Sequence, residues 1–223
     1  MVLVELSSFV LRKLRRDGVV GALSGLKTMM AAPPVSSFDR EFGTDTESVV
    51  PLWRLDIESN HRTEGIRYQT IDPGEIRIAI ASLPIHYEEF VFVDLGSGKG
   101  RSLLIASEFS FKKVVGVEFS YELNRIANSN IEKYPKQCSN VFSLHGDAAL
   151  YDFPPDNLVI YLYHPFEKPV FCRVLDNLNR SFKGLHREVF IVYFNPKLAN
   201  LLDESGLFRR LDLPASAAVY TCN

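Results

Sequence analysis

The sequence predicts an α/β protein with a doubly wound, mostly parallel sheet of seven strands, and three observations lead to that fold class. Short, almost entirely apolar segments alternate with longer segments of helical periodicity from residue 90 to the end of the chain. The apolar segments lack a regular alternation with polar residues, which indicates that helices cover both faces of the sheet. A glycine-rich turn follows the first apolar segment, at the edge where parallel sheets bind their ligands.

The first residues, 1–34, are predicted to form a helical extension that precedes the main domain at 35–223. Leucine and valine recur at helical spacing, and Pro33-Pro34 interrupts that pattern. The basic cluster at 12–16 could touch an anionic membrane, or a nucleic acid, through residues 1–30. The simpler interpretation is the solvated face of a packing helix, and both stay open.

Asp72 begins the first predicted helix of the main domain. It stands at the N-cap position, with Pro73 at the first helical position and Glu75 at the position that completes a capping box. Pro84 ends this helix, and the residues from 38 to 71 are polar and predicted to be irregular. Further helices are predicted at 101–109, 121–133, 167–182 and 197–202, and strands at 90–94, 113–118, 141–144, 158–163, 189–194, 207–211 and 218–222.

Composition and charge exclude several classes of protein. Of 223 residues, 46% are hydrophobic and 23% are charged, which is typical of a globular protein. With a net charge of −2, the chain lacks the excess of positive charge that a generic nucleic-acid binder carries. Three separated cysteines predict neither a disulfide framework nor a zinc site, and they favour a reducing, cytoplasmic setting. No apolar run is long enough to predict a transmembrane helix, and no histidine spacing predicts a metal site.

The most informative segment runs from Val91 to Ser102 and holds glycine at three alternate positions after a strand. Without Cβ atoms, Gly96, Gly98 and Gly100 let the backbone turn sharply and approach a ligand closely. The segment is therefore predicted to be a ligand-binding turn between a strand and a helix.

Two phosphate-binding loops can be compared with this segment letter by letter. A Walker A loop would need glycine at position 93 and serine or threonine at position 100, where Val93 and Gly100 stand. The dinucleotide fingerprint G-x-G-x-x-G would need its third glycine where Arg101 stands. The first loop is excluded, whereas the second is disfavoured but stays open. Lys99 and Arg101 either steer an anionic group or only stand at the start of a helix.

The pattern D-x-G-x-G-x-G, which begins at Asp94, resembles that of the class I S-adenosylmethionine-dependent methyltransferases, and the resemblance covers residues 65–223. It implies a Rossmann-like fold, S-adenosylmethionine as the cofactor and S-adenosylhomocysteine as the product. Asp94 resembles the acidic residue that fixes the loop and the amino-acid end of the cofactor. The residues that the resemblance places around the cofactor are Tyr68, Thr70, Asp94, Gly96, Ser97, Gly98, Gly100, Glu118, Phe119, Asp147 and Ala148.

Two further carboxylates continue this series. Glu118 ends the second predicted strand, where a carboxylate can accept both ribose hydroxyls, and Phe119 beside it can pack against adenine. Asp147 follows the third strand and resembles the family's third acidic position, which accepts from the adenine amine. An NAD-binding protein needs the ribose carboxylate but has no particular need of the third one, so the full series favours the methyl donor. The structural alternatives are a surface carboxylate at a strand end for Glu118 and a loop cap for Asp147.

The fourth predicted strand ends in Tyr163-His164-Pro165-Phe166, which resembles the [N/D/S]-P-P-[Y/F] loop of amine-methylating members of the family. Pro165 and Phe166 fit the last two letters, whereas Tyr163 and His164 replace the first two. The resemblance implies that Phe166 confines the methyl acceptor and that His164 or Tyr163 orients or deprotonates it. A purely structural turn is the alternative.

Tyr68 and Thr70, ahead of the Asp72 helix, resemble a segment of the lysine methyltransferases related to the mitochondrial ATP-synthase c-subunit enzyme and, more distantly, Dot1. The predicted function is methyl transfer from S-adenosylmethionine to an acceptor in a protein or a small molecule, with an amine nitrogen favoured. The alternatives are a non-catalytic cofactor-binding or scaffold protein, and an NAD-type oxidoreductase.

Overall fold

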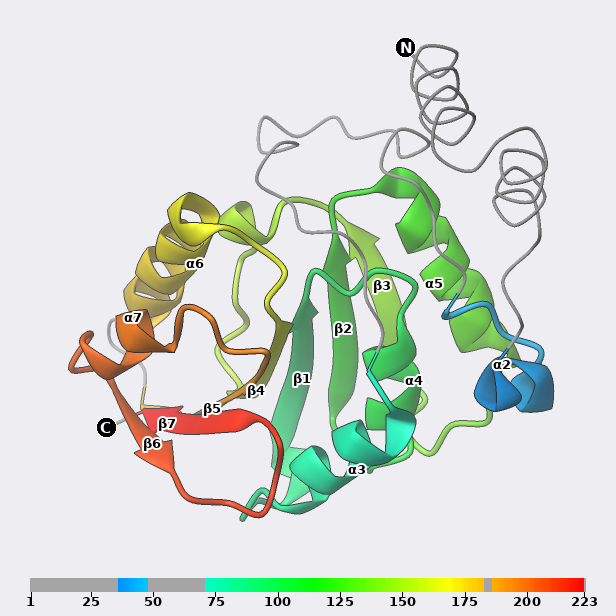
Figure 1. Ribbon diagram of the computed structural model, residues 1–223, viewed down its shortest axis with the longest axis horizontal. Helices are drawn as coiled ribbons and strands as arrows, with labels where there is room; N and C mark the ends of the chain where they lie inside the picture. Colours follow the sequence, from blue (N-terminus) through cyan, green and yellow to red (C-terminus); the bar gives the residue numbers. More distant parts are fainter. Residues whose placement is uncertain (1–35, 48–70, 183–185, 223) are drawn as a thin grey trace, which may run out of the picture.

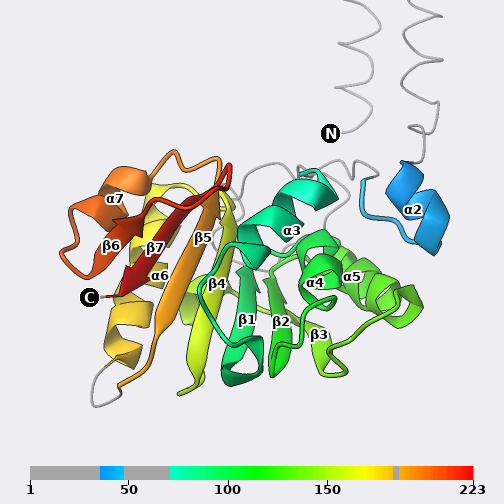
Figure 2. The same ribbon diagram turned by 90° about the horizontal axis from the view of Figure 1, so that it is seen from below.

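The computed structural model describes residues 36–47, 71–182 and 186–222 (Figure 1). The predictions for residues 1–34, and those for Tyr68 and Thr70, lie outside the described residues. Within the described part, one central sheet is flanked by helices on both sides (Figures 1 and 2).

Seven strands form the sheet in the order β3-β2-β1-β4-β5-β7-β6. Their bounds are β1 Phe90–Leu95, β2 Lys113–Glu118, β3 Val141–His145, β4 Asn157–Tyr163, β5 Val189–Phe194, β6 Phe208–Leu211 and β7 Ala218–Cys222. Strands β1 to β5 pair in parallel, and β7 is antiparallel to both β5 and β6. The strand order reverses between β1 and β4, and such a switch point opens a crevice at the carboxyl ends of the strands.

Helices cover both faces of the sheet, as Figure 2 shows. Helices α3, α4 and α5 pack on one face, and η3, α6 and α7 lie on the other. Their bounds are α3 Pro73–Ala81, α4 Arg101–Ala106, α5 Tyr121–Lys133, η3 Ala148–Leu150, α6 Lys168–Ser181 and α7 Ala199–Asp203, with a short helix η2 at Tyr87–Glu89. The predicted α/β, doubly wound, mostly parallel fold is confirmed.

The two hydrophobic cores arise from the alternation of side chains along each strand. On β1, Phe90 and Phe92 belong to the core beneath α3 and α4, whereas Val91, Val93 and Leu95 belong to the core beneath α6. Because both faces of the strand are buried, its sequence shows a continuous apolar run.

The expectation of an irregular segment after residue 38 is wrong at its beginning, because Ser37–Phe42 forms helix α2. The Ser36 side chain accepts a hydrogen bond from the Asp39 amide at 3.1 Å and caps the helix. Gly43, at φ +66°, ends it. The helix is too short to show an amphipathic period, so its caps were the only signal in the sequence.

The helix predicted at 101–109 is also shorter than expected. Helix α4 ends at Ala106, because Glu108 and Phe109 bond to carbonyls three residues back, a tighter turn than the α-helix. No helix in the described part of the chain combines the length and hydropathy needed to cross a bilayer.

Candidate active site

The turn between β1 and α4 adopts the backbone conformation that its glycines predict. Gly96, Gly98 and Gly100 all have left-handed φ values, of +84°, +54° and +84°. The amides of Gly96 and Ser97 both donate to the Val117 carbonyl, at 2.8 and 3.2 Å. These bonds hold the turn, residues 96–100 and hereafter the glycine loop, against the carboxyl end of β2.

Two of these glycines also permit close packing. A Cβ at Gly96 would lie 2.5 Å from Cβ of Pro165, and one at Gly100 would lie 3.1 Å from Cβ of Ala127. The glycine loop therefore touches the loop after β4 directly. The predicted cofactor-binding and acceptor-binding segments are thus neighbours in space, although 60 or more residues separate them in the sequence.

Glu118 lies at the centre of this arrangement. The side chain is buried, and its Oε2 and Oε1 accept hydrogen bonds from the amides of Gly98 and Ser120, each at 2.8 Å. Burial raises the pKa of Glu118 to about 7, although the backbone hydrogen bonds oppose that change. The hydrogen bond to Glu118 Oε2 therefore depends directly on the conformation of the glycine loop.

Asp94, at the end of β1, is the second buried carboxylate of the site. It accepts a hydrogen bond from the Ser102 hydroxyl, at the start of α4. The pKa of Asp94 is raised to about 7. Burial is the main cause and the negative charge of Glu118 adds to it, whereas the Ser102 hydrogen bond acts in the opposite direction. In the described residues, neither carboxylate forms an ion pair with a basic side chain.

The other predicted cofactor contacts occupy more varied positions. The Ser97 hydroxyl is buried 3.3 Å from the Ser143 hydroxyl, so it faces β3. Asp147 accepts from the Ala149 amide at 2.9 Å and caps η3, as the loop-cap alternative expects. Phe119 is half-buried, next to Glu118, and Ala148 is buried in the core beneath α6.

His164, the first residue after β4, has a left-handed φ of 40° and is 4% exposed. Its Nδ1 lies 2.9 Å from the hydroxyl of Tyr193 on β5, and the two rings stack. Burial, and then the positive charge of Lys197, lower the pKa of His164, which favours the neutral imidazole.

The Tyr193 hydroxyl holds the His164 imidazole in place. Burial raises the pKa of Tyr193 to about 12, so the phenol keeps its proton. The phenol donates to Nδ1 when His164 carries its proton on Nε2, and it accepts from Nδ1 in the other tautomer. In either tautomer this hydrogen bond engages Nδ1 and leaves Nε2 for the acceptor molecule.

Asn195, the first residue after β5, has a left-handed φ of 47°. Tyr163 pairs with Phe194 in the β4–β5 register, so His164 and Asn195 are neighbours just beyond the strands. Histidine and asparagine are among the non-glycine residues that adopt this conformation most readily, and such residues are often found at functional sites. Tyr163 is half-buried, and Phe166 is buried beneath α6, where its ring supports the loop.

Arg101 begins α4 and Lys99 directly precedes its N-cap Gly100, which agrees with the helix-start alternative. Both side chains are buried, at 0% and 4% exposure. Lys99 pairs with Asp45 at 2.9 Å, and Arg101 pairs with Glu47 at 2.8 Å. Their partners lie more than 50 residues earlier in the chain, so no local pattern could reveal them.

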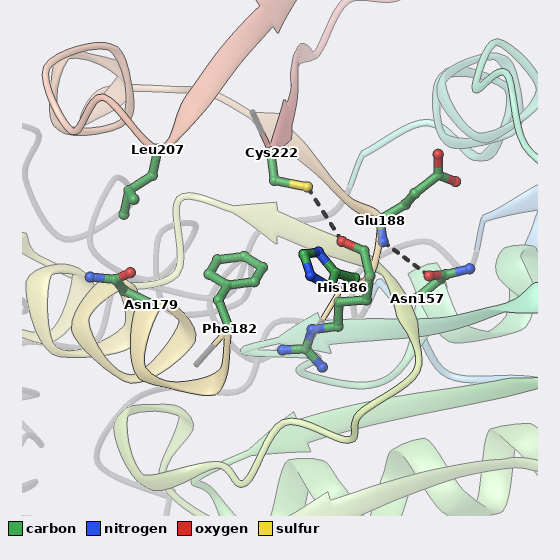
Figure 3. Close-up of a pocket in the computed structure, with 8 residues that line it drawn as sticks. Asn157, Asn179, Phe182, His186, Glu188, Leu207 and Cys222 are labelled. Atoms are coloured by element: carbon green, nitrogen blue, oxygen red, sulfur yellow. Dashed lines mark hydrogen bonds between the residues drawn. The ribbon is translucent and has the colours of Figure 1, made fainter. Parts of the chain in front are cut away.

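A cavity of about 530 Å³ lies at the opposite edge of the sheet (Figure 3). Asn157 and Glu188 line it at the amino ends of β4 and β5, and Cys222 lines it at the end of β7. Because ligands of open parallel sheets bind at the carboxyl ends of the strands, this cavity is separate from the candidate site.

Comparison with known proteins identifies the segment that contains the glycine loop. A family model described as histone methylation protein DOT1 matches residues 74–151, which include the glycine loop, Glu118 and Asp147. The resemblance to the class I methyltransferases is confirmed. A comparison with curated protein sequences finds no match.

Comparison with solved structures finds a transferase that shares the fold. A dimethyladenosine transferase from Plasmodium falciparum superposes with a TM-score of 0.50 at 14% identity, over 69% of this chain and 62% of that one. An RNA methyltransferase from Salinibacter ruber, solved with S-adenosyl-L-homocysteine, gives a TM-score of 0.47 at 21% identity, over 70% of this chain and 92% of that one. The chain thus spans less than two thirds of the Plasmodium enzyme, and at this identity the first likeness supports the fold alone.

Proposed function

We propose that this class I methyltransferase domain binds S-adenosylmethionine and transfers its methyl group to an amine nitrogen, with protein lysine as the first acceptor to test. The observation that carries the proposal is the pair of buried carboxylates, Asp94 and Glu118, beside the glycine loop and within the segment that matches DOT1.

The charge of the site fits this cofactor. Two buried carboxylates with raised pKa values and no ion-pair partner in the described residues favour a ligand that carries positive charge. S-adenosylmethionine carries a sulfonium and an ammonium group, and when bound it supplies a methyl group that is already activated. Glu118 would accept from the ribose hydroxyls with the lone pairs that its backbone partners leave free.

The acceptor half of the site fits an uncharged nucleophile. Burial lowers the pKa of His164, which favours the neutral imidazole, and Nδ1 shares a hydrogen bond with the Tyr193 hydroxyl. If Nδ1 accepts this bond, Nε2–H is a donor that orients the acceptor molecule. If Nδ1 donates it, Nε2 is a base that can take the proton of the acceptor. Methyl transfer from an activated donor depends mainly on alignment and desolvation.

An NAD-type oxidoreductase is the less favoured alternative. The position of its third loop glycine is filled by Arg101, whose Nε donates to Thr46 at 2.8 Å and whose guanidinium lies over the ring of Phe38. A dinucleotide fingerprint uses that glycine for close packing of helix on strand, and a buried arginine takes its place in this chain.

The proposed activity is tested by incubating the protein with S-adenosylmethionine that carries a labelled methyl group. Separate reactions contain cell protein, cell protein whose lysines were first chemically dimethylated, RNA, and small amines. We expect label in the untreated protein fraction and its loss after lysine blocking. Label only in RNA would contradict the lysine assignment. Cofactor binding without turnover in any reaction would support the scaffold alternative.

A further inference from the structure

The middle of the glycine loop is anchored by a buried charge. Lys99 stands between two glycines with left-handed φ values, and its side chain has no exposed area. Its Nζ donates to both carboxylate oxygens of Asp45 at 2.9 Å. A lysine is buried at high cost unless it is paired, so this contact determines where the loop can lie.

Helix α5 also stabilises the contact between Lys99 and Asp45. Asn130 on α5 is buried, and its side-chain amide donates to the Lys99 carbonyl at 3.0 Å. The same amide group donates to the Asp45 carbonyl at 2.8 Å, and its oxygen accepts from the Asp45 amide at 2.9 Å. One side chain therefore fixes the backbone of both members of the ion pair.

The segment that carries Asp45 is itself rigidly organised around another carboxylate. Asp39 accepts hydrogen bonds from the hydroxyls of Thr44 and Thr46, at 2.7 and 2.8 Å, and from the amides of Thr46 and Glu47. Burial opposes its ionisation, but these hydrogen bonds prevail and lower the pKa of Asp39. Arg101 then ties this turn to the start of α4 through Thr46 and Glu47.

The loop conformation matters because the residue before Lys99 supplies a contact of the proposed site. The Gly98 amide donates to Glu118 at 2.8 Å, and a shift of the loop would turn this amide away from the carboxylate. The Lys99 side chain has no solvent-exposed area, and its effect on Glu118 passes through the backbone of the neighbouring Gly98.

We propose that Lys99 and Asp45 form a positioning pair through which residues 36–47 set the shape of the glycine loop, so that this N-terminal segment belongs to the cofactor site. This inference rests on the proposed function, since it assigns the pair to the binding of the same cofactor. It predicts that breaking the pair weakens cofactor binding more than it weakens the fold. A buried ion pair can be replaced by apolar side chains at little cost in stability, so the two effects are separable.

The test uses the full chain and S-adenosylhomocysteine as the probe, with Lys99→Met, Asp45→Asn and the double variant. Titration calorimetry should show affinity weakened about tenfold in each single variant, and no further loss in the double variant, because both changes remove one interaction. The midpoint of thermal unfolding should change little in Lys99→Met and in the double variant, whereas Asp45→Asn leaves the buried Lys99 ammonium without its carboxylate and should lower the midpoint. The matched control is Lys112→Met, which breaks an exposed ion pair with Asp156 and should leave the affinity unchanged.

Wild-type affinity in a folded Lys99→Met variant, or additive losses in the double variant, would overturn the proposal. Should Lys99→Met fail to fold, Asp45→Asn decides, at a temperature at which thermal unfolding shows that it is folded, because the Asp45 side chain is 47% exposed and its change leaves no new cavity. Hydrogen exchange at the Gly98 and Gly100 amides gives a readout that needs no ligand. Exchange of these two amides that accelerates more than exchange of the β5 amides supports positioning, and an acceleration no larger than that of β5 overturns it, even if wild-type protein fails to bind and the proposed function falls.

Discussion

The two halves of the carboxyl edge of the sheet are built differently. On the β1–β2 half, glycines occupy the left-handed backbone positions, and the buried polar side chains include two carboxylates, Asp94 and Glu118, that have no ion-pair partner in the described residues. On the β4–β5 half, His164 and Asn195 occupy the left-handed positions, and the buried polar contact is the neutral pair of His164 and Tyr193.

This difference separates the proposed roles of the two halves. Glycine lets a ligand approach the backbone closely, whereas His164 and Asn195 place polar side chains at the corresponding turns. The first half holds two buried carboxylates without an ion-pair partner in the described residues, which suits a cationic methyl donor. The second half presents neutral polar groups, which suit the alignment of an uncharged acceptor.

The largest expected effect comes from adding a side chain to the glycine loop. Gly98→Val places a β-branched residue at φ +54°, which such residues rarely adopt, and turns the Gly98 amide away from Glu118. Cofactor binding should become undetectable by calorimetry. Gly206→Val is the matched control, because Gly206 has φ +68° and open space around it, far from the site. The control should lose stability and keep its affinity, and equal affinity losses in both variants would show that strain alone is responsible.

On the other half, substitutions should affect transfer more than cofactor binding. His164→Ala and Phe166→Ala should reduce turnover on the order of 100-fold, because a misplacement of about 1 Å can cost that much. Cofactor affinity should change by less than about tenfold. His164→Gln can place an N–H near the position of Nε2 and should retain more activity than His164→Ala. Equal turnover in the wild type and the two alanine variants would assign this loop a structural role.

A smaller effect is expected in the pH dependence of folding. Burial raises the pKa of Asp94 and Glu118 from 3.8 and 4.5 to about 7, so the folded state retains protons that the unfolded chain releases. Their contribution to the free energy of unfolding is present below pH 4 and is lost as the pH rises through 7. For Glu118 alone, this loss lowers the free energy of unfolding by roughly 3 kcal/mol. Thermal unfolding without ligand should show this decline, and Glu118→Gln should flatten it. An unchanged slope in Glu118→Gln would mean that other groups titrate.

The smallest effect is expected from removal of the N-terminal extension. A chain that begins at Val35 keeps Ser36, which caps α2, and keeps the Asp45 contact with Lys99. Its affinity for S-adenosylhomocysteine should equal that of the full chain. Loss of soluble, folded protein would place residues 1–34 in the core of the domain.

Local patterns predicted most of this fold, and distance along the chain explains what they missed. Apolar runs such as Val189–Phe194 placed the strands well, because a strand buried on both faces has an unambiguous sequence. The three glycines and Glu118 predicted where the proposed cofactor site lies. The burial of Lys99 could not be predicted, because its partner Asp45 lies 54 residues away. The roles of the site residues in catalysis stay predictions.

Titration calorimetry of the wild-type protein with S-adenosylmethionine, and separately with NAD, tests the central claim most directly. The buried carboxylates and the glycine loop predict one S-adenosylmethionine site per chain and no measurable heat with NAD. In the same experiment, Glu118→Ala should weaken binding by about 1–3 kcal/mol, because ribose hydroxyls lose a buried acceptor. Absence of heat with S-adenosylmethionine, tighter binding of NAD, or full affinity in Glu118→Ala would contradict the account.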